Sequence, residues 1–392
     1  MDPTYLIPAF PSSDISKYMK NKHVVHVYVD LKNAMTSLFI KEVSDNIVSN
    51  SEINNITDST IFQSCLYYSA YWKNYCSKMG LDCKVFFCTD VGKSMYHRSI
   101  LKSYKHRRDI TDTSAIGIID IKLKEIRDKN FLVSDNIINR LRDVYFFTLR
   151  YLESDFLPHY LIYHKFKEVQ DCLHVIVSSD KDLMQSLTHP NIIMISKSSG
   201  VRHVTDYTSF LHRYAHTNSL SENVKENMMR ISSELDSKLF PFIMSVVGDD
   251  GDDIPGIKGI GPMKSIKMFH NNEKIINGLL GDIDSVRDRV HNGGKIFHED
   301  KIRISDLSAD WRKAFLENDL ITQAFKLIDF EMLIKWLHNN DMTEKKVLVD
   351  YINNVIDKKE ETQIPSISSF MLGVKNIRDF NLHENSLKPL FE

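Results

Sequence analysis

The sequence predicts an α/β protein whose mainly parallel, doubly wound sheet is followed by a region built of helices. Up to about residue 220, short apolar runs such as VVHVYVD and KVFFCTD alternate with helical patterns, as a parallel sheet with crossover helices requires. These runs are apolar at nearly every position, which is typical of strands buried on both faces. After residue 220 the patterns are helical only.

The predicted elements follow an irregular extension over residues 1–22, in which three prolines occur. Strands are predicted at Val24–Asp30, Lys84–Asp90, His174–Asp182 and Asn191–Ser196. Helices are predicted at 60–79, across most of 94–150 with a break at 111–117, and at 155–170, where Pro158 fits the first turn. The chain therefore divides into the extension, an α/β core at 23–220 and a helical region at 221–392.

Composition sets limits on partners and on location. The net charge of −2 gives no global attraction to nucleic acid, so any such contact must come from local patches. The five cysteines contain no CxxC pair, which favours reduced intracellular thiols and does not favour a zinc site. The N-terminus lacks the pattern of a signal peptide, and no apolar run approaches the ~18 residues of a membrane span. We expect a cytoplasmic monomer without a membrane contact.

Carboxylates follow the ends of several predicted elements. The eight candidate metal ligands are Asp30, Asp90, Glu153, Asp155, Asp180, Asp182, Asp249 and Asp252. Any single one is more simply explained as a solvated turn residue or a helix cap. Together they fit a shared edge, because ligands bind beyond the carboxyl ends of parallel strands. Oxygen-only ligands predict two Mg²⁺ ions, for which Mn²⁺ can substitute, and two such ions suit an in-line displacement at phosphorus.

A basic segment follows the second predicted strand. It carries Lys93, Arg98, Lys102, Lys105, Arg107 and Arg108, with Tyr104 interleaved. As one helix, it would place Arg98, Lys102 and Lys105 on a common face. This composition suits contacts with phosphates and stacking of an aromatic ring on a base. The alternative is a solvated basic face of a helix.

A glycine-rich loop precedes a helical pattern that begins near Pro262. Its candidate DNA-binding residues are Gly256, Lys258, Gly259, Gly261, Lys264 and Lys267. Exposed backbone amides at the start of a helix form an anion site. The segment 248–270 is similar to a helix–hairpin–helix, which grips a nucleic-acid backbone without reading bases. The alternative is a simple turn between two helices.

Four motifs in this order resemble the flap endonuclease / 5′→3′ exonuclease family. They are GDDGDDIPGIKGIG at 248–261, SSDKDLMQSL at 178–187, Glu153-Ser154-Asp155, and YKHRR at 104–108. Within the family, the resemblance is strongest to the replicative 5′-nucleases, or ribonucleases H, of T-even bacteriophages. The resemblance implies a PIN-like nuclease core with a helical arch at about 93–130, and a structure-specific 5′-nuclease that acts on flapped DNA and RNA–DNA hybrids during replication and repair.

The resemblance also implies roles for residues. Asp30, Asp90, Glu153 and Asp155 would form a first metal site, and Asp180, Asp182, Asp249 and Asp252 a second. Lys93, Arg98, Lys105 and Arg108 would act in catalysis from the arch. The 256–264 loop would bind the duplex backbone, with K⁺ as a further ion. A sliding clamp or a single-strand-binding protein would be the protein partner, although the clamp-like stretch 363–371 is also explained as a structural helix.

The sequence departs from the family pattern at a few positions. Phe156 stands where a further acid is common, Asp253 replaces an asparagine, and Ser179 and Leu31 replace glycines. Two other functions remain open on the sequence. One is a catalytically silent binder of DNA junctions, which would keep the glycine-rich loop alone. The other is a PIN-like ribonuclease for single strands, a class that lacks this loop.

Overall fold

The structure is a computed structural model of the 392-residue chain. It describes residues 13–34, 58–106, 138–166, 171–198, 201–215, 221–271, 282–294, 319–339, 342–360, 366–374 and 384–391. Arg107, Arg108 and most of the predicted arch lie outside these residues, as does the break predicted at 111–117.

A six-stranded sheet forms the centre of the molecule, with the strand order β3-β2-β1-β4-β5-β6. The strands are β1 Val24–Asp30, β2 Asp82–Val91, β3 Val144–Arg150, β4 Cys172–Val177, β5 Ile192–Ser198 and β6 Val201–Thr205. All neighbours are parallel except β5 and β6, which pair in antiparallel fashion. The predicted fold class, a mainly parallel α/β sheet, is confirmed.

Two strands differ from the sequence prediction. The helix expected across 94–150 is wrong at its end, because Val144–Arg150 forms β3 and pairs with β2. The run VYFFTLR is rich in aromatic and β-branched residues, which fit a pleated surface better than a helix. Strand β6 was not predicted, and it lies at the opposite edge of the sheet. The sheet therefore extends one strand further on each side than the sequence suggested.

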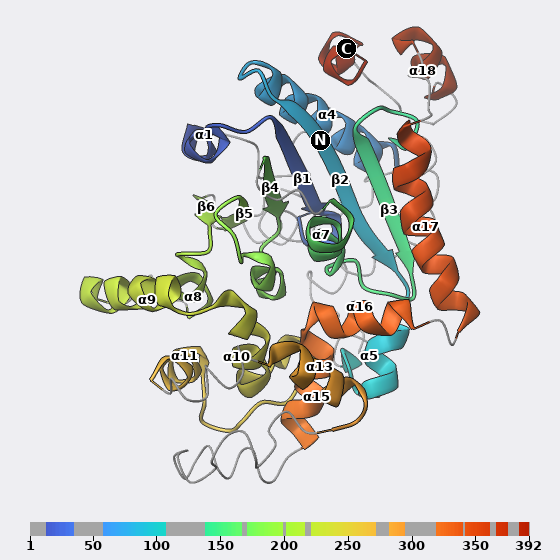
Figure 1. The fold of residues 1–392 in the computed structure, drawn as a ribbon. Helices are drawn as coiled ribbons and strands as arrows, with labels where there is room; N and C mark the ends of the chain where they lie inside the picture. The colour runs from blue at the N-terminus through green and yellow to red at the C-terminus, as the bar shows by residue number, and fades with distance from the viewer. Residues whose placement is uncertain are drawn as a thin grey trace, which may run out of the picture.

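The two faces of the sheet pack into two separate cores, as the alternation of side chains along a strand requires. On one face, Val27, Phe87 and Val175 are fully buried beneath α4 (Asp58–Ser77), which contributes Trp72. On the other face, Tyr28 lies in a core that continues into the helical region. Figure 1 shows β1, β2 and β3 side by side, with α4 behind their upper half.

Short helices connect the strands of the core. They are α1 Ser13–Met19, α5 Met95–Ile100, α7 Leu157–Tyr160, the π-helix η3 Leu161–Phe166, the 3-10 helix η4 Lys181–Ser186 and α8 Phe210–Tyr214. The irregular extension predicted over 1–22 is wrong for α1, whose Ile15 and Met19 are buried in the core. Pro158 lies in the first turn of α7, as predicted.

Helices make up the described residues after 220. They are α9 Glu222–Glu234, η6 Ser237–Leu239, α10 Phe240–Val247, η7 Asp250–Asp252, α11 Pro262–His270, α13 Ile283–His291, α15 Asp319–Ile328, α16 Phe330–His338, α17 Thr343–Glu360, α18 Ile367–Val374, α19 Glu384–Leu387 and η9 Lys388–Leu390. None of these described segments adds a strand to the sheet. The boundary of the helical region at 221 stays a prediction.

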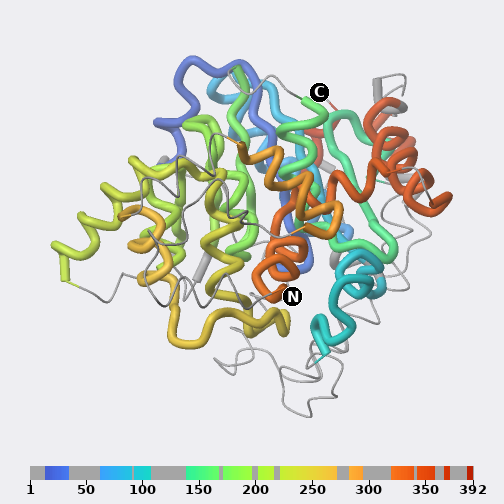
Figure 2. The backbone as a smooth tube through the Cα atoms, turned by 60° about the horizontal axis from the view of Figure 1, so that its bottom comes forward, coloured from blue at the N-terminus to red at the C-terminus, as the bar shows by residue number. Residues whose placement is uncertain are grey.

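These helices lie mainly below the carboxyl ends of the strands. Figure 1 shows α10, α13, α15 and α16 beneath the sheet, and α17 beside β3. In Figure 2, where this end comes forward, the orange helices after residue 319 lie over the middle of it. The hydroxyl of Tyr351 on α17 accepts a hydrogen bond from the Thr148 amide of β3 at 2.9 Å. The helical region thus covers both the carboxyl edge and one side of the sheet.

The clamp-like stretch at 363–371 contains the start of α18. Phe370 on this helix is buried against Phe391, with 5.4 Å between the ring centroids. This packing favours the structural explanation of the stretch. In the described part of the chain, the search for a helix long and apolar enough to cross a membrane finds none.

Candidate functional site

Acidic side chains follow each of four neighbouring parallel strands. Asp30 ends β1, Asp90 lies near the end of β2, and Asp180 comes three residues after β4. Glu153 and Asp155 follow β3, so they too come from the carboxyl end of a strand and not from a helix. Because all four strands run in the same direction, these acids meet at one edge of the sheet.

Small hydroxyl side chains hold two of these carboxylates in place. The hydroxyl of Ser178 donates to Asp30 at 2.9 Å, and the amide of Asn33 donates to the other oxygen at 3.1 Å. The hydroxyl of Ser154 donates to Asp90 at 3.3 Å. Asp30 and Asp90 are 7 % and 8 % exposed, so the carboxylates face the interior of the site. Their orientation is thus set before any ion binds.

The SDKD motif is a helix start and not an extended segment. Asp180 caps the 3-10 helix η4, because its side chain accepts a hydrogen bond from the Asp182 amide at 3.1 Å. The prediction that both acids project from one side of a strand is wrong here, since β4 ends at Val177. The helical turn instead buries Asp182, which is 9 % exposed.

The loop after α10 brings the last two acids to the same place. Asp249 and Ile254 exchange two backbone hydrogen bonds of 2.8 Å, which fold the loop back on itself. Asp249 also caps η7 by accepting from the Gly251 amide at 2.9 Å. Three carboxylate oxygens lie within 4.8 Å of one another, one each from Asp182, Asp249 and Asp252. These three acids form the most compact group of carboxylates among the described residues.

The backbone of this loop accounts for three of its residues, namely Gly248, Gly256 and Asp253. Gly248 ends α10 with a φ of 76°, and Gly256 packs so closely that an added Cβ would lie 1.8 Å from the Val247 carbonyl oxygen. Gly256 is therefore required for packing inside the loop. Asp253, which stands where the family keeps asparagine, has a φ of 59°. Asparagine and aspartate both tolerate this left-handed conformation, which accounts for the substitution.

Lys105 and Tyr104 contact the acids directly. The Lys105 ammonium lies 2.6 Å from Glu153 and 3.4 Å from Asp252. The Tyr104 hydroxyl donates to the same two carboxylates, at 2.9 and 3.1 Å. The Lys105 amide also donates to the Asp252 carbonyl at 3.1 Å. These contacts join the basic segment, the end of β3 and the loop after α10 into one cluster.

Burial and mutual repulsion control the charge of the acids. Burial, reinforced by Asp180, raises the pKa of Asp30 to about 7. Burial and the neighbouring Asp180 raise the pKa of Asp182 well above its usual range, and burial with Glu153 does the same for Asp155. Burial alone would also raise the pKa of Glu153, but Lys105, His97 and Lys32 together outweigh it, and the pKa falls below its usual range. Without cations, burial and repulsion therefore favour the protonated forms of Asp30, Asp155 and Asp182.

The donor set fits a hard divalent cation. One carboxylate oxygen of Asp155 and one of Asp182 are buried and have no hydrogen-bond partner among the described residues. A buried oxygen without a partner is costly, and a coordinated ion removes that cost. All eight predicted ligands offer carboxylate oxygens, which are the ligands that Mg²⁺ and Mn²⁺ prefer.

The basic segment does not form the single helix that the sequence suggested. Helix α5 ends at Ile100, and Lys102 and Lys105 follow in turns, with a φ of 53° at Lys105. The ring of Tyr104 is 4 % exposed and stacks on His97 at 4.5 Å, so it is not presented for stacking on a base. Lys93 and Lys102 are exposed, and Arg98 is half-buried. The predicted catalytic Arg108 lies outside the described residues.

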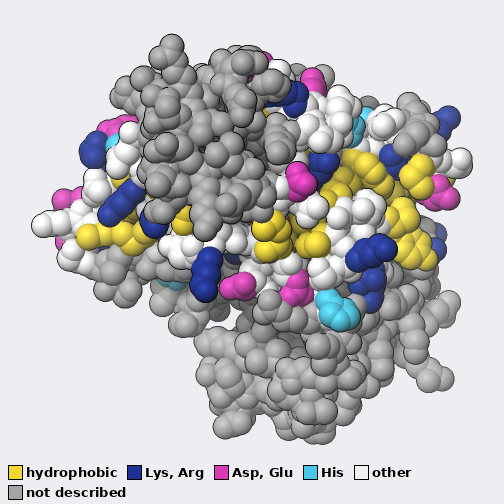
Figure 3. Space-filling model, turned by 90° about the horizontal axis from the view of Figure 1, so that it is seen from below, with side chains coloured by type: hydrophobic (Ala, Val, Ile, Leu, Met, Phe, Trp, Pro, Cys, Tyr) yellow, Lys and Arg dark blue, Asp and Glu magenta, His cyan; other side chains and the backbone are white. Residues whose placement is uncertain are grey.

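The other predicted DNA-binding residues lie at or near the surface. Lys258, Gly259, Gly261, Lys264 and Lys267 are exposed, in the loop and on α11. A Cβ added at Gly259 or Gly261 would meet nothing within 4 Å, so a ligand can approach this backbone. Figure 3 shows that positive and negative side chains mix on the described part of the lower face of the molecule, without one continuous basic patch.

Sequence reasoning missed several residues of the site. Lys32 lies 3.9 Å from Asp90, and Lys181 lies 3.2 Å from Asp249. Lys32 lies two residues after Asp30, and Lys181 lies one residue before Asp182. This closeness in sequence to predicted ligands could have identified both lysines. His97 was missed as well. Its Nε2 donates a hydrogen bond to the Leu327 carbonyl of α15, 3.1 Å away, a contact that no local pattern shows.

Solved structures of a bacteriophage T5 protein are similar to this fold. The T5 5′-exonuclease with bound zinc matches with a TM-score of 0.52 at 16 % identity, over 86 % of this chain and 99 % of that one. The chain has the T5 5′-exonuclease fold. A T5 protein co-crystallised with metal ions matches with a TM-score of 0.51 at 16 % identity, over 85 % and 98 % of the two chains. A T5 flap endonuclease in a pseudo-enzyme–product complex with DNA and metal ions gives 0.51 at 15 % identity, over 86 % and 99 %.

Similarity in sequence is more limited than similarity in fold. DNA polymerase I of Caldicellulosiruptor bescii is 22 % identical to the chain over 239 residues. This match covers 55 % of the chain, and the chain spans only 25 % of the polymerase. No protein-family model matches the sequence. The resemblance inferred from the four motifs is thus confirmed as the 5′-exonuclease fold.

Proposed function

We propose that the protein is a metal-dependent, structure-specific 5′-nuclease that hydrolyses phosphodiester bonds with two divalent ions. The proposal rests on one observation, which is the meeting of eight carboxylates from five chain segments at one edge of the sheet. Lys32, Lys105 and Lys181 contact these acids. The carboxylates outnumber these ammonium groups, and two divalent ions would supply four further positive charges.

The two ions would be Mg²⁺, with Mn²⁺ as a substitute. Asp30, Asp90, Glu153 and Asp155 would hold the first, and Asp180, Asp182, Asp249 and Asp252 would hold or support the second. When bound, such ions activate a water and stabilise the leaving oxygen of an in-line displacement. Ser178 and Ser154 would keep the ligands of the first site oriented. Lys93 and Arg98 would attract the phosphate, because they follow directly on β2.

The substrate would be branched or flapped DNA and RNA–DNA hybrid with a 5′ end, as in the removal of RNA primers. The exposed loop backbone at Gly259 and Gly261, with the lysines of α11, would bind the duplex backbone, and K⁺ would bind in that loop. The complex of the T5 flap endonuclease with DNA supports this choice. A sliding clamp or a single-strand-binding protein stays a predicted partner, and Phe370 would have to leave its packing to reach a clamp.

The experiment compares Asp182→Asn with Asp250→Asn on a labelled 5′-flap duplex. Asp182 belongs to the compact group of three acids, whereas Asp250 is exposed in the same region and matches it in charge. We expect wild-type protein and Asp250→Asn to cleave in Mg²⁺ or Mn²⁺. Asp182→Asn should lose at least about 100-fold in rate while binding the duplex normally, since a charge-stabilising group contributes on that scale.

Three outcomes separate the alternatives. Equal cleavage by Asp182→Asn and wild type would refute the proposed metal site. Intact binding of the flap with no cleavage in either ion would show a catalytically silent junction binder. Equal cleavage of a single strand and of the flap would favour a PIN-like ribonuclease. An RNA-primed duplex tested in parallel decides whether RNA 5′ ends are substrates.

A further inference from the structure

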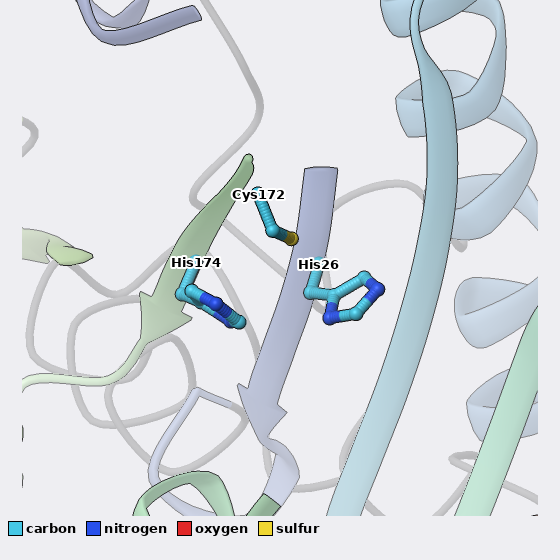
Figure 4. A group of neighbouring side chains, drawn as sticks. All are labelled: His26, Cys172 and His174. Atoms are coloured by element: carbon cyan, nitrogen blue, oxygen red, sulfur yellow. The ribbon is translucent and has the colours of Figure 1, made fainter. Parts of the chain in front are cut away.

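A second cluster of ligand-type side chains lies inside the sheet, at the other end of the strands from the acids. His26 on β1 and His174 on β4 are directly paired, and Cys172 lies two residues before His174, so all three share one face. One ring nitrogen of each histidine and the Cys172 sulfur lie within 4.8 Å of one another. Figure 4 shows the three side chains gathered around these two strands.

Packing and hydrogen bonds hold the cluster in place. His26, Cys172 and His174 are 6 %, 7 % and 0 % exposed. The Tyr28 hydroxyl lies 3.3 Å from Nδ1 of His26 and 3.0 Å from Nδ1 of His174, so one group orients both imidazoles. The Phe166 ring packs on His26 with 4.7 Å between centroids. Metal-binding histidines typically have their second nitrogen fixed by such a partner.

One atom of the cluster lacks an explanation in terms of folding alone. Nε2 of His174 is buried and has no hydrogen-bond partner among the described residues. A buried polar atom without a partner is costly to the folded state. Burial and the nearby His189 lower the pKa of His174 to about 4, and burial with His174 lowers the pKa of His26 well below its usual range. A histidine binds a metal ion through the lone pair of its neutral imidazole.

We propose that His26, Cys172 and His174 bind a soft metal ion of the class of Cu(I) and Zn²⁺. Thiolate and imidazole ligands select these ions, whereas Mg²⁺ and Mn²⁺ prefer oxygen. Bonds of about 2.0–2.3 Å place ligand atoms roughly 3.5–4 Å apart, so the side chains would close by at most roughly 1 Å on binding. The Cys172 thiol gives its proton to solvent and its sulfur binds the ion, so that affinity rises with pH.

The charge count distinguishes between the two ions. One thiolate and two neutral imidazoles carry a single negative charge, which Cu(I) balances and Zn²⁺ exceeds by one. An uncompensated charge is expensive in a buried site. Lys84 adds a further positive charge nearby, since its ammonium lies 6.0 Å from the centroid of the Phe166 ring that packs on His26. Three ligands also suit Cu(I), so we expect it to bind more tightly than Zn²⁺.

The test uses the full-length reduced protein with saturating Mg²⁺, so that the acids are already occupied. Cu(I) is titrated anaerobically against a chromophoric Cu(I) chelator, and Zn²⁺ is titrated in a second arm. We expect one equivalent of Cu(I) with a near-ultraviolet thiolate absorption band. Cys172→Ser should abolish the band and weaken binding by about tenfold or more. Cys65→Ser, a buried cysteine on α4 in the opposite core, should retain both.

A measurement on the wild-type protein makes the test independent of variant folding. X-ray absorption at the copper edge should show one sulfur and two nitrogen neighbours. A shell without sulfur, or a thiolate band that persists in Cys172→Ser, would overturn the site. If the wild-type protein bound Zn²⁺ but not Cu(I), and Cys172→Ser no longer bound Zn²⁺, the site would be supported and the charge argument overturned. None of these readouts depends on nuclease activity, so the proposed function and this inference can fail separately.

Discussion

The ammonium group of Lys105 occupies a place among the acids that suits a cation. It lies between Glu153 and Asp252, and the backbone at this residue adopts a left-handed conformation with a φ of 53°. Such a conformation in a residue other than glycine costs free energy and persists only where the surroundings impose it. The contacts of Lys105 with the two carboxylates supply that constraint. In the metal-free protein, this lysine acts as the internal counterion of the cluster.

Replacing Lys105 with methionine should therefore destabilise the metal-free protein. We expect Lys105→Met to lower the free energy of unfolding by about 1–3 kcal/mol in EDTA, because two partly buried carboxylates lose their charged partner. In saturating Mg²⁺ the difference should shrink, since ions replace the ammonium. Urea denaturation in both conditions measures this. Lys102→Met is the control, because Lys102 is exposed three residues away. Equal losses in EDTA and in Mg²⁺ would contradict the counterion role.

The raised pKa of Asp30 predicts an unusual pH dependence of stability without metal. The folded carboxyl has a pKa of about 7, above the value of about 3.9 in an unfolded chain. The folded state thus binds the proton more tightly. Its contribution to stability is full below pH ~4 and is lost as the pH rises to about 7. In EDTA, Asp30→Asn should flatten the fall in stability between these pH values and stabilise the protein at pH 7. A steeper fall in the variant would contradict the assignment.

At the scale of single residues, the sequence named the acids and Lys105 as candidates and missed Lys32 and Lys181. Asp30, Asp90, Asp180 and Asp182 were predictable because they lie at the ends of runs that the sequence indicated as strands. The roles of Glu153, Asp155, Asp249 and Asp252 rested on the family resemblance, because no predicted strand precedes them. Tyr104 was misassigned to DNA stacking, because only the tertiary structure turns its hydroxyl toward Glu153 and Asp252. Phe156, where the family commonly has an acid, is fully buried in the core, and its ring lies 6.3 Å from that of Tyr160. Long-range contacts of this kind leave no local pattern.

At the scale of elements, the sequence prediction missed strand β3 because of the residues that precede it. The residues before it read as a long helical stretch, and VYFFTLR is short enough to be absorbed into that pattern. The segment forms a strand because it pairs with β2. This parallel pairing brings Glu153 and Asp155 to the same edge of the sheet as the other acids. Four strands were placed correctly, but only Val24–Asp30 has the predicted bounds. The strand predicted at His174–Asp182 begins at Cys172 and ends at Val177, because Asp180 instead caps a 3-10 helix.

Two glycines of the loop between α10 and α11 should respond differently to replacement by alanine. An added Cβ at Gly256 would lie 1.8 Å from the carbonyl oxygen of Val247, and backbone atoms cannot move aside cheaply. We expect Gly256→Ala to lower the free energy of unfolding by at least about 2 kcal/mol. Gly261→Ala should change it by less than about 0.5 kcal/mol, because an added Cβ meets nothing within 4 Å. Thermal or urea unfolding of both variants checks this. Similar stability of the two would show that the loop is not packed in this way.

At the scale of the whole molecule, Glu331 joins the helical region to the nuclease-like core. On α16, its carboxylate lies 3.1 Å from His159 and 2.8 Å from His164, which belong to α7 and η3. Burial alone would raise the pKa of Glu331, but its hydrogen bonds with the two histidines outweigh this and hold the pKa below its usual range. A group with a lowered folded pKa stabilises the protein above its unfolded pKa and loses that effect as the pH falls.

Removing this carboxylate should loosen the attachment of the helical region. We expect Glu331→Ala to cost about 2 kcal/mol at pH 7 and less below about pH 4, as carboxyls become protonated. Glu222→Ala is the matched control, since Glu222 also lies in the first turn of a helix but its side chain is 74 % exposed. Its effect should stay within about 0.5 kcal/mol. Denaturation curves at both pH values measure this. A pH-independent loss in Glu331→Ala would exclude the charge as the cause.

The arrangement of whole regions was only partly predictable. The alternation of strands and helices indicated a parallel sheet, because this pattern is local and repeats. The position of α15 and α16 below the carboxyl edge was not indicated, because it depends on contacts such as that of Gln185 with the Ile328 carbonyl at 3.0 Å. Such contacts join residues far apart in sequence. Helix periodicity shows which face is apolar but not which partner covers it.

The spread of the carboxylates along the chain has a consequence for protein synthesis. Asp30 is the first of the acids to be synthesised, whereas Asp249 and Asp252 are synthesised only after all six strands. Nascent domains fold as they leave the ribosome, from the N-terminus onward. A growing chain can therefore assemble the sheet and its first acids while the compact group of three is still missing. Each molecule gains the complete cluster of carboxylates only late in its own translation, and an interrupted message yields a fragment without it.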